Sequence, residues 1–302
     1  MKRKELLGLA LKQVIDMPVI SSNPLRFISD ELGLVWTIEG VSDMVEKVAL
    51  IGQPYRLKEG RVVYFRSGKL RLRINLIERE LCAGQLLVVS PGTVFEVLGY
   101  SGDFDLTMLA FANSFMENWQ KEDLLITYMQ GRISQAFSLD EATRKRMEAL
   151  FALLWSVLHD EAFSRETVQG IISILFHQLA YIQKRKPLEK EQRHTRQEEV
   201  FNRFINLVNN YAIRERNVAF YADNLFLTSR YLSTLIREIS GRTVMDWVND
   251  AVIQEAKLRL FHTDKLVYEI AEELNFPNSS FFCKFFRRMT GKTPHAYRQE
   301  GQ

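Results

Sequence analysis

The chain has 302 residues, which at roughly 100–200 residues per domain predicts two domains. Apolar residues make up 46% and charged residues 25%, as in an ordinary globular protein whose core needs neither disulfides nor metal. The formal net charge of +3 is too small to indicate a nucleic-acid partner by itself. The two widely separated cysteines, Cys82 and Cys283, give no disulfide framework and fit a reducing compartment.

The start of the chain does not favour a secretory signal. Its apolar run covers only residues 6–11 and is ended by Lys12 and Gln13, with no small-residue cleavage site before Asp16. The sequence contains no window of about 18 uncharged apolar residues, so no segment is expected to cross a membrane. We therefore expect a cytoplasmic protein without membrane association.

Short β-rich runs occupy about residues 34–111. Residues 70–76 alternate apolar and polar side chains with a period of two, which is typical of a half-buried strand. Turn signals, Ser67-Gly68 and Pro91-Gly92, punctuate the region. The other apolar runs are residues 34–38, 61–65, 86–89 and 104–111. Many short strands at this spacing favour a small sandwich or barrel.

Helical spacing begins after about residue 114 and predicts two amphipathic helices. Their apolar positions are Met147, Leu150, Phe151, Leu154 and Leu158 in the first, and Ile171, Ile172, Leu175, Leu179 and Ile182 in the second. The stripe is wide enough to pack on the β domain and also against a second subunit. A seam between subunits would use Met147, Leu150, Leu154 and Trp155, and burial within one subunit is the equally open alternative.

Residues 184–199 are polar and charged and contain Pro187, which predicts a linker. Several basic side chains crowd this stretch. Their ordinary interpretation is a solvated linker, and the alternative is an arm that contacts DNA phosphates.

The remaining residues contain one helix-turn-helix pattern twice, over residues 220–237 and 267–287. In each copy a small residue, Ala222 or Ala271, marks a close helix crossing. A turn follows, and then a residue suited to cap the next helix, Thr228 or Asn278. A single match of this kind is weak evidence, but a tandem pair is much stronger.

The second helix of each copy has one apolar and one polar face. The apolar positions are Leu232, Leu235 and Ile236 in the first copy and Phe282, Phe285 and Phe286 in the second. Gly241 and Gly291 are placed to end these helices. Residues 243–261 predict one long helix between the copies. This spacer would set the two modules about one DNA turn apart, roughly 34 Å, so that they enter successive major grooves.

These residues resemble the DNA-binding domain of the AraC/XylS family over about a third of the chain. The most specific stretches are residues 278–288 and 291–298. Two departures stand out. Asn275 replaces the usual Gly of the second turn, where Asn tolerates left-handed backbone angles. Val252 stands where the family commonly has Arg, so a role for that Arg is not carried over.

The resemblance implies which side chains meet DNA. The base-reading positions it implies are Arg230, Ser233, Thr234, Ser279, Ser280 and Lys284. The phosphate-contacting positions are Arg237, Lys257, Arg287, Arg288 and Lys292. An Arg can pair with guanine through two hydrogen bonds, whereas Ser and Thr discriminate less between bases.

In this family the β-rich half is usually a cupin-like barrel that binds an effector. All five histidines of this chain lie at residue 159 or beyond, so a cupin metal centre is not expected, and neither metal nor cofactor is predicted. Nor does the chain show a nucleophile elbow, a P-loop or a zinc-protease motif. Candidate effector-binding residues by type are Trp36, Tyr55, Arg56, Tyr64, Phe65, Arg71, Arg73 and Phe95.

The sequence therefore predicts an α+β protein. A cupin-like barrel or sandwich with flanking helices is expected over residues 1–183, a linker over 184–199, and an all-α domain with two helix-turn-helix units over 200–302. The expected function is sequence-specific transcription regulation, more often activation in this family, in response to a small molecule. Expected partners are double-stranded DNA, a second copy of the chain and, for an activator, RNA polymerase. The alternatives are a helical protein-interaction module and a cupin enzyme with a regulatory tail.

Overall fold

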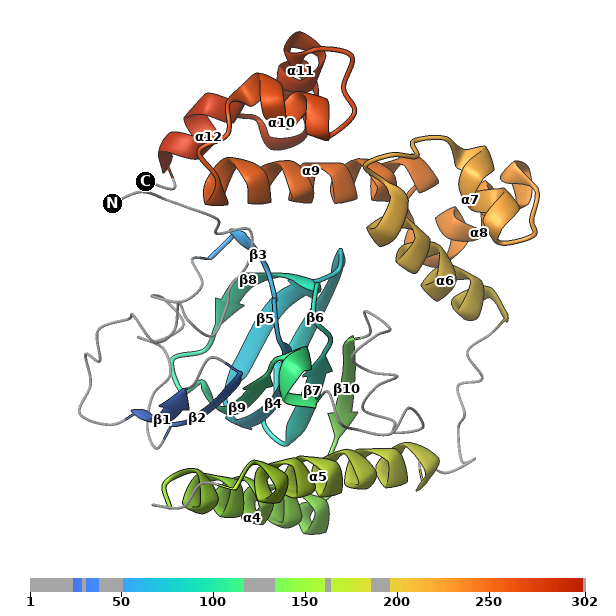
Figure 1. Cartoon of the computed structure of the whole chain (residues 1–302). Helices are drawn as coiled ribbons and strands as arrows, with labels where there is room; N and C mark the ends of the chain where they lie inside the picture. The colour runs from blue at the N-terminus through green and yellow to red at the C-terminus, as the bar shows by residue number, and fades with distance from the viewer. Residues whose placement is uncertain are drawn as a thin grey trace. The chain divides into compact units, whose positions relative to one another are not determined.

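The computed structural model describes residues 24–28, 31–37, 51–116, 134–160, 164–185 and 196–300. The chain divides into two compact units, one covering Gly8–Pro187 and the other Leu188–Gln302 (Figure 1). The first is built on β-sheets and the second is helical, which confirms the predicted α+β class.

The N-terminal unit contains two antiparallel sheets. Its strands are β1 (Pro24–Ile28), β2 (Leu32–Thr37), β3 (Pro54–Arg56), β4 (Gly60–Ser67), β5 (Lys69–Ile74), β6 (Ile77–Cys82), β7 (Gln85–Val89), β8 (Val94–Tyr100), β9 (Asp105–Phe111) and β10 (Ser134–Ser138). One sheet has the order β1-β2-β9-β4-β7-β10 and the other β3-β8-β5-β6. Several neighbouring strands are not consecutive in the sequence, because the chain passes back and forth between the two sheets. Two sheets of this kind agree with the predicted sandwich or barrel.

Strand β4 shows how the layers are stacked. Its side chains alternate between the two faces of the sheet. Val62 and Tyr64 belong to the apolar core shared with two helices, whereas Val63 and Phe65 face the other way, where β4 contacts β6. All four are buried, so the six-stranded sheet is covered on both faces: by the second sheet inside the sandwich and by helices outside it.

The covering helices are α4 (Glu141–Leu158) and α5 (Arg165–Arg185), which lie together on one side of the sheets (Figure 1). Asp140 caps α4 by accepting a hydrogen bond from the Thr143 backbone N–H at 2.7 Å. Met147 and Leu154 are 0% and 1% exposed within the core of this unit, so for these two residues the structure favours burial within one subunit over a seam between subunits. Leu150 and Trp155 are partly buried against the same core, which the sheet shares with α4 and α5.

Helices border the predicted linker on both sides. Helix α5 continues to Arg185 and α6 begins at Arg196, so both ends of the 184–199 segment are helical. The reason is local: these ends are made of Lys, Arg, Gln and Glu, which are strong helix formers as well as polar residues. Residues 186–195, with Pro187, lie outside the described residues.

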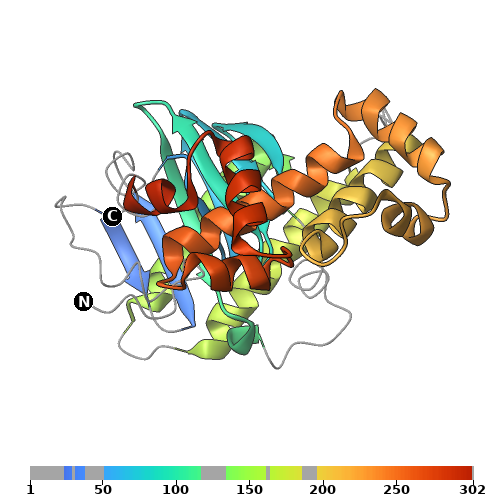
Figure 2. The ribbon, with the colours of Figure 1, turned by 90° about the horizontal axis from the view of Figure 1, so that it is seen from above.

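The C-terminal unit consists of α6 (Arg196–Tyr211), α7 (Val218–Asn224), α8 (Ser229–Ser240), α9 (Val244–His262), α10 (Val267–Glu273), α11 (Ser279–Thr290) and α12 (Pro294–Glu300). Helix α9 contacts two groups of helices: α6 and α8 form the first group, and α10, α11 and α12 form the second. Figure 2 shows the same arrangement from a second direction, with α9 running from one helix group to the other. None of the described helices is both long and apolar enough to cross a membrane.

Candidate nucleic-acid interface

Each helix-turn-helix is closed by the same backbone contact. The Leu227 N–H donates to the Ala222 carbonyl at 2.9 Å in the first copy, and the Phe276 N–H donates to the Ala271 carbonyl at 2.9 Å in the second. Both alanines are buried, at 0% and 1% exposure, so a larger side chain would separate the crossing helices. The small residues predicted at the crossings are confirmed.

The two turns share a left-handed residue. Asn275 has φ 55°, which confirms that Asn serves where the family often has Gly, and its Nδ2 donates to the Ile213 carbonyl at 3.2 Å. The first turn places Phe226 at φ 58°, with its ring 89% exposed. A bulky residue rarely adopts these angles, so the first turn carries backbone strain that the sequence pattern did not reveal.

The ends of the recognition helices follow the predicted caps. The Thr228 hydroxyl accepts from the Tyr231 N–H at 3.2 Å, and Asn278 Oδ1 accepts from the Phe281 N–H at 3.1 Å. Gly241 and Gly291 end α8 and α11 in left-handed conformation, with φ 68° and 76°.

The predicted apolar faces turn inward. Leu232, Leu235 and Ile236 of α8 are buried, as are Phe282 and Phe286 of α11. Phe285 is half-buried, and its ring packs against Phe276 with centroids 5.2 Å apart. The polar side chains of α8 and α11 therefore lie on the opposite faces of these helices.

The structure places most predicted base-reading side chains on these outer faces. Arg230, Ser233, Thr234, Ser280 and Lys284 are exposed, and Ser279 is half-buried. The Ser233 and Thr234 hydroxyls donate to the carbonyls of Ser229 and Arg230, at 2.8 and 3.1 Å. Each oxygen can still accept a hydrogen bond, which in a major groove would come from the amino group of adenine or cytosine.

The predicted phosphate contacts fall into two groups. Arg237, Arg287, Arg288 and Lys292 are exposed at or beyond the C-terminal turns of α8 and α11. Lys257 differs, because it is half-buried on α9 with its ammonium 5.8 Å from the ring centroid of Tyr297. Val252 is 1% exposed on the same helix, so this position is core.

Sequence reasoning missed the exposed aromatic rings at and just before the starts of the two recognition helices. Tyr231 and Phe281 are 50% and 59% exposed in the first turns of α8 and α11, and Phe226 precedes α8. Tyr231 and Phe281 occupy matching places in the two copies, and that repetition was the available signal. Also missed was Arg216, whose partners lie about 60 residues further along the chain.

The candidate effector residues of the N-terminal unit do not gather at one place. Tyr55 is buried and stacks on Phe95 at 5.7 Å, and Arg73 pairs with Glu96 at 2.6 Å, all on the four-stranded sheet. Phe65 packs against Phe104 at 6.0 Å. Arg56 is half-buried and Arg71 exposed, and the Trp36 side chain lies outside the described part of the chain. Among the described residues, no group of three or more His, Cys, Asp or Glu is arranged to hold a metal.

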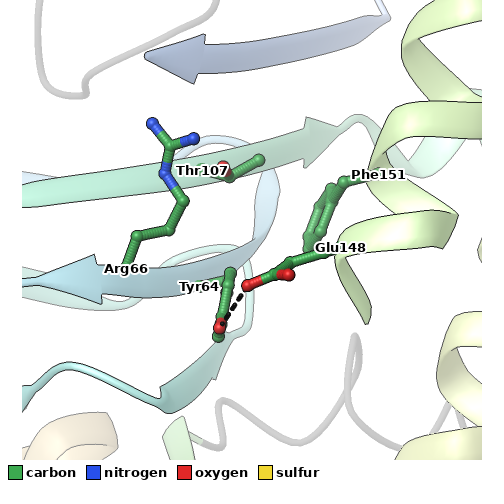
Figure 3. Close-up of a pocket in the computed structure, with 5 residues that line it drawn as sticks. All are labelled: Tyr64, Arg66, Thr107, Glu148 and Phe151. Carbon is green, nitrogen blue, oxygen red and sulfur yellow. Dashed lines mark hydrogen bonds between the residues drawn. The ribbon is translucent and has the colours of Figure 1, made fainter. Parts of the chain in front are cut away.

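One of the candidates, Tyr64, lines a cavity formed by residues of β4, β9 and α4. The cavity measures about 240 Å³ and is lined by Tyr64, Arg66, Thr107, Glu148 and Phe151 (Figure 3). The Tyr64 hydroxyl donates to Glu148 Oε1 at 3.1 Å, and burial together with this carboxylate raises the pKa of Tyr64 to about 12. Arg66 pairs with Asp105 at 2.6 Å, and Figure 3 shows its guanidinium turned away from Glu148.

Comparison with known proteins assigns the C-terminal unit. Residues 221–300 match the family model described as a helix-turn-helix domain. Regulatory protein PocR of Salmonella typhimurium is 37% identical over 79 residues, covering 26% of this chain and 26% of that protein. The HTH-type transcriptional activator RhaR of Cronobacter sakazakii is 34% identical over 74 residues, covering 24% and 26%. The chain thus spans about a quarter of the length of the curated relatives it matches. Among solved structures, ToxT from Vibrio cholerae is 14% identical over 80% of this chain and 90% of that one, with a TM-score of 0.39.

The fold and these matches define a tandem helix-turn-helix domain of the class that presents recognition helices to duplex DNA. Over this region the chain is similar to helix-turn-helix transcription regulators such as PocR and RhaR.

Proposed function

We propose that the protein is a sequence-specific transcription regulator that reads two successive major grooves. The observation that carries this proposal is the duplicated unit with an outward polar face on α8 and on α11, joined by α9. The 19 residues of α9 span about 28 Å at a rise of about 1.5 Å per residue. That length is close to the roughly 34 Å of one DNA turn.

The test is to select duplexes from a random pool with the full-length chain and to footprint the selected site. We expect two protected segments about one helical turn apart on one face of the DNA, and affinity that falls steeply with salt. Leu153→Gln, on an exposed residue of α4, is a matched control that should leave the footprint unchanged. Absence of salt-dependent DNA binding would instead favour a helical protein-interaction module.

We further propose that the N-terminal unit senses a small molecule and that the protein acts as a cytoplasmic homodimeric activator that contacts RNA polymerase. The cavity under α4 supports the sensing role because it combines an aromatic wall with polar groups of both charges. At about 30 Å³ per water, it has room for about eight waters, so a ligand would be small. Thermal-shift screening of metabolites against the wild type and Glu148→Gln tests the site, and a reporter placed beside the selected operator tests the sign of regulation.

A further inference from the structure

A second hollow lies in the C-terminal unit, beside the recognition helix α11. It measures about 370 Å³ and is lined by Arg216, Phe276, Pro277, Phe281, Lys284, Phe285 and Arg288. Arg216 comes from the segment between α6 and α7, whereas Phe276 and Pro277 come from the turn between α10 and α11. Three of the lining side chains are cationic and none is acidic.

Arg216 is held firmly in this hollow. Its guanidinium carbon lies 4.1 Å from the ring centroid of Phe276, and its Nη2 donates to the carbonyl of Leu274. The nearby hydrogen bond from Asn275 to Ile213 fixes the same segment against the same turn. A guanidinium has five N–H donors in a rigid fork, so one such bond leaves donors that a second acceptor can use.

The charges converge without a lining carboxylate to balance them. Lys284 and Arg288 are four residues apart on one flank of α11, and Arg216 lines the same hollow from the segment between α6 and α7. Burial already lowers the pKa of Arg216, as expected for a cation that has given up water. Three cations around one space favour an anion with several acceptor oxygens, and a phosphate group has this character.

The position of the hollow beside α11 indicates that the phosphate group belongs to the DNA backbone. An α-helix with its side chains is about 10–12 Å in diameter, and the major groove is about 12 Å wide. A helix inserted into the groove therefore brings its flanks against the sugar-phosphate backbone. The exposed ring of Phe281, 59% accessible, stands on this same flank.

We propose that this hollow binds a phosphate group of the DNA backbone, with Arg216 as an anchoring contact outside the two helix-turn-helix motifs. The proposal rests on the proposed DNA-reading function. It adds that the segment between α6 and α7 joins the interface of the second motif. Arg216 thus fixes the register of α11 on the DNA and does not select a base.

The test compares full-length wild type, Arg216→Gln and the matched control Arg214→Gln, which removes an exposed cation two residues away. Affinity is measured for the selected duplex and for a random-sequence duplex from 50 to 200 mM salt. Losing one phosphate contact should lower the steepness of log affinity against log salt by about 0.9. The affinity of Arg216→Gln should then fall about 3.5-fold less than that of wild type over this range. It should be weaker for both duplexes alike, and Arg214→Gln should match wild type.

Arg216→Lys keeps the charge but loses the planar stack on Phe276, and it should keep the wild-type salt dependence. Melting curves of all variants identify any that fail to fold, and Arg288→Gln, from the same hollow, should then reproduce the reduced slope. An unchanged slope in both Gln variants, or weakening confined to the selected duplex, would overturn the proposal. A second result would also overturn it. In that result, inorganic phosphate competes with DNA for wild type more strongly than chloride at the same ionic strength does, but the salt dependence of DNA binding by Arg216→Gln equals that of wild type. If wild type itself binds no duplex, the proposed function fails, which is a separate and visible result.

Discussion

Arg230 and Arg287 are both exposed arginines on recognition helices, but their places on those helices differ. Arg230 lies in the first turn of α8, and Arg287 lies in the last turn of α11. If Arg230 pairs with guanine, Arg230→Ala should cost about 1–3 kcal/mol of binding free energy and relax the preference at one base pair. Arg287→Ala should weaken binding to all sequences alike and lower the salt slope by about one unit.

Affinities for a set of single-base operator variants at several salt concentrations separate these two roles. Both variants should remain folded, because neither side chain belongs to the buried face of its helix. The two roles are reversed if Arg230→Ala lowers the affinity for all operator variants equally and Arg287→Ala changes the base preference. If neither variant changes DNA binding, the DNA-binding face has been assigned to the wrong side of both helices.

Phe226 offers a test of strain in the first turn. A left-handed conformation costs a non-glycine residue about 1–2 kcal/mol, and the ring, 89% exposed, recovers little through packing. Phe226→Gly should therefore raise the free energy of unfolding by about 0.5–1 kcal/mol in urea titrations, after the greater freedom of Gly in the unfolded chain is subtracted. Phe226→Ala keeps the strained backbone and should give no gain. A gain with Ala equal to that with Gly would trace the effect to the exposed ring and not to the backbone.

At the scale of single elements, the N-caps of the recognition helices invite a direct measurement. Thr228→Ala and Asn278→Ala each remove a side-chain acceptor from a backbone N–H at a helix start. Each should lower the free energy of unfolding by about 1 kcal/mol. Thr234→Ala removes an exposed hydroxyl inside α8 and should cause no loss, because Ala is the better helix former there. Equal losses in all three variants would contradict a specific capping role.

Elements with a clear hydrophobic period or a continuous apolar run could be predicted from the sequence, whereas strands with neither signal could not. Strand β5 alternates apolar and polar residues and was found, as were α4 and α5 from their helical stripes. Strand β6 was missed because Glu78, Arg79 and Glu80 dilute its alternation on a mostly exposed face. Strand β8 was missed because its pairing with β5 shifts register between Arg71 and Leu72, and Gly99 interrupts its pattern.

At the scale of the whole molecule, the helix-turn-helix surface was predictable and the two hollows were not. Residues that act from one helix face follow a fixed spacing, so Arg230 or Lys284 can be placed from sequence alone. Arg216 and Phe276 come from different turns, and Arg66 and Glu148 come from a strand and a helix that lie far apart in the sequence, with six strands between them. Contacts of this kind depend on how turns pack, which no local period encodes.

The division into two units predicts that the C-terminal one functions by itself. Its core draws on residues from its own helices, including Ile270, Phe282 and Phe286, each 0% exposed. We therefore expect a fragment of residues 196–302 to unfold cooperatively and to bind the selected duplex with the salt slope of the full chain. Limited proteolysis of the full chain should cut within residues 184–199, which are polar and lack an apolar stripe.

A small molecule that binds under α4 should change DNA affinity in the full chain and have no effect on the fragment. Glu148→Gln in the full chain should remove the response and keep the DNA affinity, because Glu148 lines the N-terminal cavity. Circular dichroism melting and DNA titrations of both proteins provide the measurement. A fragment that is unfolded in isolation would show that the boundary is misplaced. A fragment that responds to the small molecule would move the sensing site out of the N-terminal unit.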